Sequence, residues 1–219
     1  MSAKSVRRLV RYGVDVALFI LLLFLMSYPV TRGLMRHGVC GALFLALLLV
    51  HQIVNGGWYR SLFRGRWNRS RILLFVSDTV LMAASLMLAA SSLAMAGEVF
   101  SFAPFPMASW GRSLHNAASA WTFVLAAFHL GLHGRAVWKW LEKALGRFCY
   151  PVLLAAFLAG AFCFWESGLL DSMLFLEGFG TQAAGPAAFL MQYLGEVIFL
   201  CLPAQILTKS LSRNKPTGD

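Results

Sequence analysis

The sequence predicts an all-α, polytopic membrane protein with six transmembrane helices, and its composition, its long apolar runs and the placement of its basic residues all support this. Of its 219 residues, 59% are hydrophobic and only 13% are charged. A soluble domain of this size could not bury so much apolar surface, so we expect the chain to lie in a lipid bilayer. Apolar runs recur from end to end, which leaves no stretch polar enough to form a separate soluble domain.

Six segments approach the length of about 20 mostly apolar residues that a spanning helix needs. They are Tyr12–Tyr28, Gly38–Val54, Ile72–Ala96, Ser113–Leu132, Tyr150–Trp165 and Pro186–Leu207. The first segment follows basic residues as a signal peptide would, but residues 26–30 (MSYPV) contain no small-x-small cleavage site. We therefore expect a first helix that is retained.

The basic residues predict how the helices are oriented. Of the 19 Lys and Arg residues, 16 lie in the N-terminus, the second-to-third connection, the fourth-to-fifth connection and the C-terminus, and the others are Arg32, Arg36 and Arg112. By the positive-inside rule, both termini are cytoplasmic. Because the formal net charge of +10 is spread over these short connections, it sets topology and does not indicate nucleic-acid binding.

Four of the five histidines form two equally spaced pairs on the second and fourth predicted helices. An interval of 14 residues separates His37 from His51, and the same interval separates His115 from His129. Fourteen residues are close to four helical turns, so each pair shares one helix face with its members about 21 Å apart. Since the two helices run in the same direction, His37 is level with His115 near the outer surface, and His51 is level with His129 near the inner surface.

Two facing imidazoles at each level predict two non-covalent b-type haems, with His37, His115, His51 and His129 as the metal ligands. The fifth histidine, His133, follows His129 by one turn. It could replace His129 as the inner ligand, bind a haem propionate, or lie at the cytoplasmic interface; the matching interval favours His129.

Haem propionates need cationic or polar partners near the membrane surface. The predicted partners at the outer haem are Arg32, Arg36 and Arg112, and those at the inner haem are Arg60, Arg66 and Arg135. The alternative role of each arginine is to set topology alone.

Carboxylates inside predicted spans are a second group of candidates. Asp15 and Asp78 lie near cytoplasmic helix ends, where we expect pairing with Arg11 and Arg71. Glu196 lies deeper and is a candidate for proton handling at a quinone site.

The histidine segments resemble a family of short bacterial b-type cytochromes long known only as a domain of unknown function. Residues 37–41 (HGVCG), 51–55 (HQIVN), Trp58 and 64–68 (RGRWN) carry this resemblance, together with residues 114–115, Trp121 and 129–133 (HLGLH). The family is more distantly similar to the cytochrome b subunits of formate dehydrogenases and hydrogenases. Its members usually have an acidic residue after the first histidine, where this chain has Gly38.

The resemblance covers about residues 10–135 and implies a four-helix di-haem bundle. We therefore divide the chain into a haem-binding membrane domain at 1–135 and two further transmembrane helices with a cytoplasmic tail at 136–219. What it implies about function is an oxidoreductase subunit of the bacterial inner membrane that transfers electrons between a membrane quinone and an extracytoplasmic redox partner. Members are often encoded beside flavin-binding electron-transfer proteins, which suggests a flavoprotein as that partner.

Two hypotheses without haem compete with the di-haem hypothesis. In the first, the histidines and Glu196 form a proton pathway or part of a small transporter, although the sequence shows no internal repeat and no pair of broken helices. In the second, the chain is a structural membrane subunit, which leaves the histidine interval unexplained.

Overall fold

The computed structural model describes residues 3–28, 33–64, 67–95, 109–176 and 185–213, and within these ranges the chain is helical without strands. The long helices are α1 (Ala3–Met26), α3 (Leu34–Val54), α5 (Arg69–Met95), α6 (Ser109–His133), α8 (Cys149–Glu166) and α10 (Pro186–Arg213). The shorter elements are α4 (Gly57–Leu62), α7 (Arg135–Leu145), the 3-10 turn η1 (Gly146–Phe148) and α9 (Leu169–Met173). Each of the six predicted segments overlaps one long helix.

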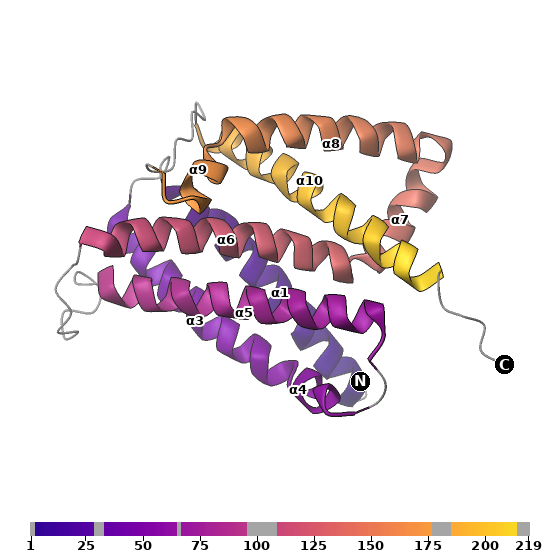
Figure 1. The fold of residues 1–219 in the computed structure, drawn as a ribbon, viewed down its shortest axis with the longest axis horizontal. Coiled ribbons are helices and arrows are strands. Elements are labelled where there is room, and N and C mark those ends of the chain that lie inside the picture. Colours follow the sequence, from indigo (N-terminus) through magenta and orange to yellow (C-terminus); the bar gives the residue numbers. More distant parts are fainter. Residues whose placement is uncertain (1–2, 29–32, 65–66, 96–108, 177–184, 214–219) are drawn as a thin grey trace.

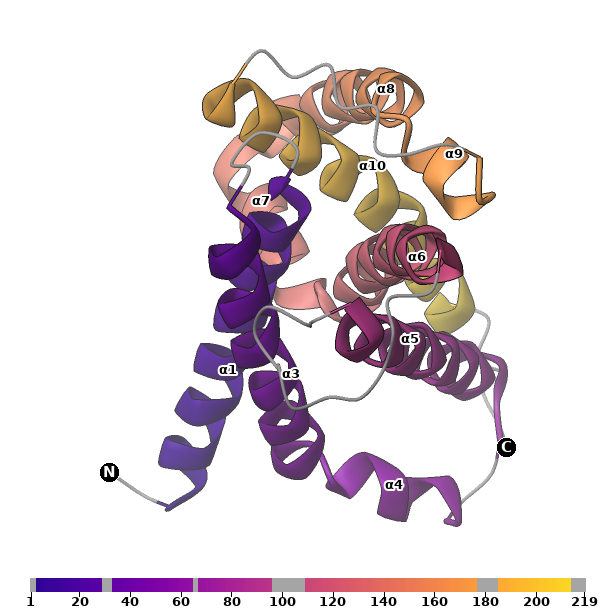
Figure 2. The same cartoon turned by 90° about the vertical axis from the view of Figure 1, so that its left-hand side faces the viewer.

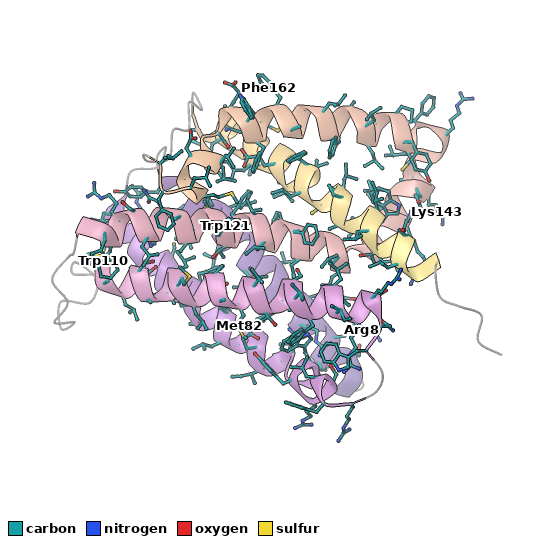
Figure 3. All side chains as sticks on the ribbon, viewed as in Figure 1. Arg8, Met82, Trp110, Trp121, Lys143 and Phe162 are labelled. Carbon is teal, nitrogen blue, oxygen red and sulfur yellow. The ribbon has the colours of Figure 1, made fainter. Side chains whose placement is uncertain are left out.

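The long helices run back and forth between two ends of the molecule (Figure 1). One end holds the start of α1, α4, α7 and the end of α10, and we call it the termini end. The other holds the starts of α3, α6 and α10, and we call it the far end. Figure 3 shows Arg8 and Lys143 toward the termini end and Trp110 at the far end. The elements with most of the basic residues therefore share one end, as the charge pattern predicts.

The helices form two groups that differ in packing. Helices α1 and α3 pack chiefly on each other, whereas α6 packs on α5, α9 and α10, and α10 also packs on α8. Figure 2 looks nearly along α5, α6 and α8 and shows α1 and α3 beside them at a different inclination. Helices α3 and α6 nevertheless run in the same direction, from the far end to the termini end.

The exterior is largely apolar, unlike that of a soluble protein, and the interior buries polar residues beside apolar ones. The side chains of Leu158, Phe162 and Trp165 on α8 are 60%, 68% and 76% exposed, and Phe162 lies on the outer face of that helix in Figure 3. The buried polar residues are Ser27, Ser77, Ser85, Ser91, Ser119, Thr122, Ser167, Ser172, Glu196 and Gln205. Such a surface is stable in lipid, so the chain is a membrane protein.

Five helical stretches are long and apolar enough to cross a membrane, and they contain α1, α3, α5, α8 and α10. Helix α6 has the length but is not among them. It is enclosed by other helices and buries Ala117, Ala120, Phe123 and Ala127. Because protein and not lipid surrounds this face, small and polar residues replace the long apolar side chains that a lipid-facing helix requires.

A shared apolar core connects α1, α3 and α6 to α9 and α10. Its buried members are Leu22, Leu23, Met26, Phe44, Ala120, Phe123, Ala127, Leu169, Met173, Phe189, Tyr193 and Val197. They come from α1, α3, α6, α9 and α10. The division into two domains at residue 135 stays a prediction.

Candidate functional site

At the far end, α3 and α6 bring two of the predicted ligands together. The ring centres of His37 and His115 are 6.0 Å apart with an interplanar angle of 72°. Tyr28, at the end of α1, places its ring centre 5.0 Å from that of His37. The parallel course of α3 and α6 thus puts His37 level with His115.

Two serines on α5 fix the protonation of His115. Its Nδ1 atom lies 3.3 Å from Ser92 Oγ and 3.5 Å from Ser91 Oγ. Both hydroxyl groups already donate to the carbonyl oxygen of Leu88, at 2.7 Å and 2.9 Å. Each hydroxyl can therefore only accept from the imidazole, so Nδ1 carries the proton and Nε2 keeps its lone pair.

At the termini end, each predicted ligand binds a carboxylate on the preceding helix. His51 Nδ1 lies 2.8 Å from Asp15 Oδ1, and His129 Nδ1 lies 2.8 Å from Asp78 Oδ1. An ionised carboxylate is only an acceptor, so each imidazole donates from Nδ1. A neutral imidazole that donates from Nδ1 keeps its lone pair on Nε2, where a metal can bind.

His133 belongs to the same termini-end neighbourhood. Its ring centre is 4.6 Å from that of His129, and Asp15 and His51 lie in its neighbourhood. Ligand atoms of Asp78, His129 and His133 all lie within 4.8 Å of one another. Two imidazoles and one carboxylate at this spacing are a donor set that suits first-row transition metals.

The structure does not bring His51 and His129 into ring contact among the residues it describes, in contrast to the far-end pair. Of the predicted propionate partners, Arg36 and Arg112 are exposed in the first turns of α3 and α6. Arg60 and Arg135 are exposed at the termini end, on α4 and α7. Arg32 and Arg66 lie outside the described residues.

The expected pairing of Asp15 with Arg11 and of Asp78 with Arg71 is wrong. Both carboxylates bind histidine, while Arg11 donates to the carbonyl oxygen of Val54 at 3.1 Å. Arg71 donates to the carbonyl oxygens of Ser61 and Leu62. A guanidinium near a helix end finds unpaired carbonyl groups there, which leaves the carboxylates for the imidazoles.

The α1–α3 and α5–α6 hairpins repeat one arrangement that the sequence analysis missed. Asp15 on α1 and Tyr28, two residues after the end of α1, are 13 residues apart and contact His51 and His37. On α5 the same 13-residue interval separates Asp78 from Ser91, which contact His129 and His115. The sequence contains this repeat as two equal 13-residue intervals. A search for a repeat of fixed period misses it because the loops within the two hairpins differ in length.

Glu196 on α10 is fully buried, as is its neighbour Tyr193, and neither has a side-chain hydrogen-bond partner of normal geometry among the described residues. Ser167 and Gln192 are the polar side chains that lie close to the carboxyl group. Nearby, Gly195 lies against Gly160 of α8 at a close helix crossing. The predicted deep position of Glu196 is therefore confirmed, and it is not part of either histidine level.

No protein-family model, curated protein or solved structure matches this chain. The argument about function therefore depends on the geometry of the two histidine levels.

Proposed function

We propose that this chain holds two b-type haems between its α1–α3 and α5–α6 hairpins and carries electrons across a membrane. The observation that carries this proposal is the state of the imidazoles. In three of the four predicted ligands, Nδ1 donates to a side chain on the paired helix of the same hairpin. A metal-bound histidine almost always donates its second ring N–H in this way, because the bond fixes the ring and leaves Nε2 for the metal.

The far-end pair also has a suitable separation. An imidazole nitrogen binds a first-row metal at about 2 Å, so two imidazoles on opposite sides of one ion place their ring centres about 6 Å apart. His37 and His115 are 6.0 Å apart. They would hold the far-end haem, and His51 and His129 the termini-end haem. When bound, a b-type haem supplies a one-electron couple between ferric and ferrous iron.

The exposed arginines near each level suit the propionates. Arg36 directly precedes His37, and Arg112 lies one turn before His115. Arg135 comes two residues after His133 at the other end. Each guanidinium can bind a carboxylate through two hydrogen bonds, and exposed side chains can rotate to do so.

We further propose six membrane crossings, with α6 as the sixth, in the bacterial cytoplasmic membrane. Helix α6 runs beside α5 and α10 and has a comparable length. The elements rich in Lys and Arg lie at the termini end, which supports a cytoplasmic position for that end. A membrane quinone and an extracytoplasmic redox protein, such as a flavoprotein, are the proposed partners.

A second candidate function follows from the Asp78, His129 and His133 group. These residues could bind a non-haem transition metal at the termini end, since two histidines and one carboxylate leave further coordination positions open. A proton pathway through the histidines and Glu196 without any metal is the third possibility.

Visible spectroscopy and metal analysis of the purified protein test these candidates together. The haem proposal predicts a Soret band, a reducible α-band and about two haems per chain by the pyridine haemochrome assay. One non-haem metal per chain without a Soret band would favour the second candidate. A folded protein with neither would favour the proton pathway.

Labelling of single cysteines in intact cells tests the orientation. A cysteine at Ser61 should resist an impermeant reagent, and one at Ser101 should react. The opposite result would overturn the proposed topology.

A further inference from the structure

We infer that Asp15 and Asp78 are positioning residues that give the termini-end site a lower reduction potential than the far-end site. This inference rests on the proposed di-haem function and adds a direction to it. It follows from an asymmetry between the partners of the two histidine levels.

At the termini end, both predicted ligands contact a carboxylate through Nδ1. The Nδ1 to Oδ1 distances are 2.8 Å for His51 with Asp15 and 2.8 Å for His129 with Asp78. Hydrogen bonds to a charged acceptor are roughly twice as strong as those between neutral groups. Both imidazoles at this level therefore gain electron density.

At the far end, the imidazole of His115 has neutral hydrogen-bond partners, and that of His37 has none among the described residues. His115 Nδ1 donates only to serine hydroxyl groups, at the longer distances of 3.3 Å and 3.5 Å. His37 contacts the rings of Tyr28 and His115 and has no described hydrogen-bond partner on its imidazole. These imidazoles lack the charged acceptors that the termini-end pair has.

The partner of an axial ligand is one of the few means by which a protein tunes a metal. A carboxylate raises the basicity of the imidazole and adds a negative charge nearby, and both effects stabilise ferric over ferrous iron. The termini-end site, with two such carboxylates, should therefore hold its electron less tightly than the far-end site.

The positive charges around the termini end oppose this effect only weakly. The guanidinium of Arg11 binds the carbonyl oxygen of Val54, and that of Arg71 binds the carbonyl oxygens of Ser61 and Leu62. Arg60 and Arg135 are exposed, so salt screens them. The carboxylates, in contrast, are in direct contact with the ligands.

The favourable direction for an electron is then from the termini end to the far end. A quinol oxidised at the termini end would release two protons to water at that end and give up two electrons, which would pass one at a time to two molecules of a one-electron acceptor at the far end. With the proposed topology, this is outward electron transfer.

A spectroscopic redox titration of the intact, haem-loaded protein tests the inference. Asp15→Asn and Asp78→Asn keep an oxygen that can accept from the imidazole but remove the charge. Each variant should raise the midpoint potential of the lower-potential component by at least about 59 mV, which is a tenfold change in the equilibrium constant of a one-electron couple. The higher-potential component should stay in place. Ser92→Ala is the matched far-end control and should leave the lower component unchanged.

His115→Ala and His51→Ala assign the two components, since the first should remove the higher and the second the lower. Asp78→Glu keeps the carboxylate that Asp78→Asn removes, so the lower component should keep a low midpoint potential in this variant. A merely structural role of Asp78 would not require this difference between the two variants. The inference is overturned if two haems are present but neither aspartate variant moves a potential, or if His115→Ala removes the lower component. Absence of haem from the folded wild-type protein would instead overturn the proposed function itself.

Discussion

The α1–α3 and α5–α6 hairpins each contain one Asp–His contact of 2.8 Å, but they bury the aspartate to different extents. Asp15 is 44% exposed and its partner His51 25%, whereas Asp78 is 15% exposed and His129 28%. Helices α1 and α3 pack chiefly on each other, but α6 is covered by α9 and α10. Two contacts of the same kind and distance are therefore enclosed differently by the neighbouring helices, and we expect this to set how strongly each contact affects stability.

The two hairpins should nevertheless be equally necessary for haem binding, which is the largest effect that we expect. His51→Ala and His129→Ala should each reduce the haem content from about two to about one per chain. The reason is that each iron needs two imidazoles, one from each hairpin. His37→Ala and His115→Ala should each remove the other haem. The pyridine haemochrome assay gives the number, and redox titration shows which component is lost.

The double variant His37→Ala/His115→Ala is the control for this pairing. It should resemble either single variant, since both residues serve one site and the other site is about 21 Å away along the helices. A double variant with no haem would mean that the two levels are not independent.

The closer packing of α6 predicts a difference between two glycines. A Cβ atom at Gly131 would lie 2.5 Å from the carbonyl oxygen and 2.8 Å from the Cα atom of Cys201 on α10, whereas a Cβ atom at Gly41 on α3 meets only Leu25 at 4.0 Å. Gly131→Ala should therefore lower the free energy of unfolding by about 1–3 kcal/mol. Gly41→Ala should raise it by up to about 1 kcal/mol through helix propensity.

Thermal unfolding in detergent, followed by circular dichroism, measures both glycine variants. Equal melting temperatures for Gly131→Ala and the wild type would show that α6 and α10 are not in close contact. That result would remove the packing difference between the hairpins.

The aspartates should differ in their effect on stability although their contacts match. Asp78 is 15% exposed, so Asp78→Ala removes a largely enclosed partner of His129 and should destabilise the protein by about 1–3 kcal/mol. Asp15→Ala should cost less than about 1 kcal/mol, because water can replace an exposed partner. The same unfolding experiment compares them, and a larger loss for Asp15→Ala would contradict the burial argument.

The smallest effect should come from replacing His133, a residue at which the two hairpins differ. Four residues after His51 the chain has Asn55, and four residues after His129 it has His133. Asn55 Nδ2 lies 3.4 Å from His51 Nδ1. His133→Asn makes the second hairpin more similar to the first and should keep both haems with only a small change in the termini-end potential. Loss of the termini-end haem in this variant, but not in His129→Ala, would identify His133 as the ligand.

The sequence by itself determined the helical segments, the membrane environment and the levels of the histidines. These features depend on local properties: the length of apolar runs, the distribution of Lys and Arg, and the 3.6-residue period that puts His37 and His51 on one face. Because they need no knowledge of which helices are neighbours, the helical segments could be predicted for all six long helices, α6 included. Glu196 could be placed deep in its helix for the same reason.

Only the tertiary structure decided which polar groups bind one another. Asp15 has Arg11 one turn away on its own helix, yet its partner is His51 on α3, and Asp78 likewise binds His129 on α6. Such pairs depend on the register between two helices, which the sequence does not encode in any single interval. The sequence also did not predict that other helices enclose α6. A helix surrounded by protein does not need the long apolar side chains that contact with lipid requires of the other helices.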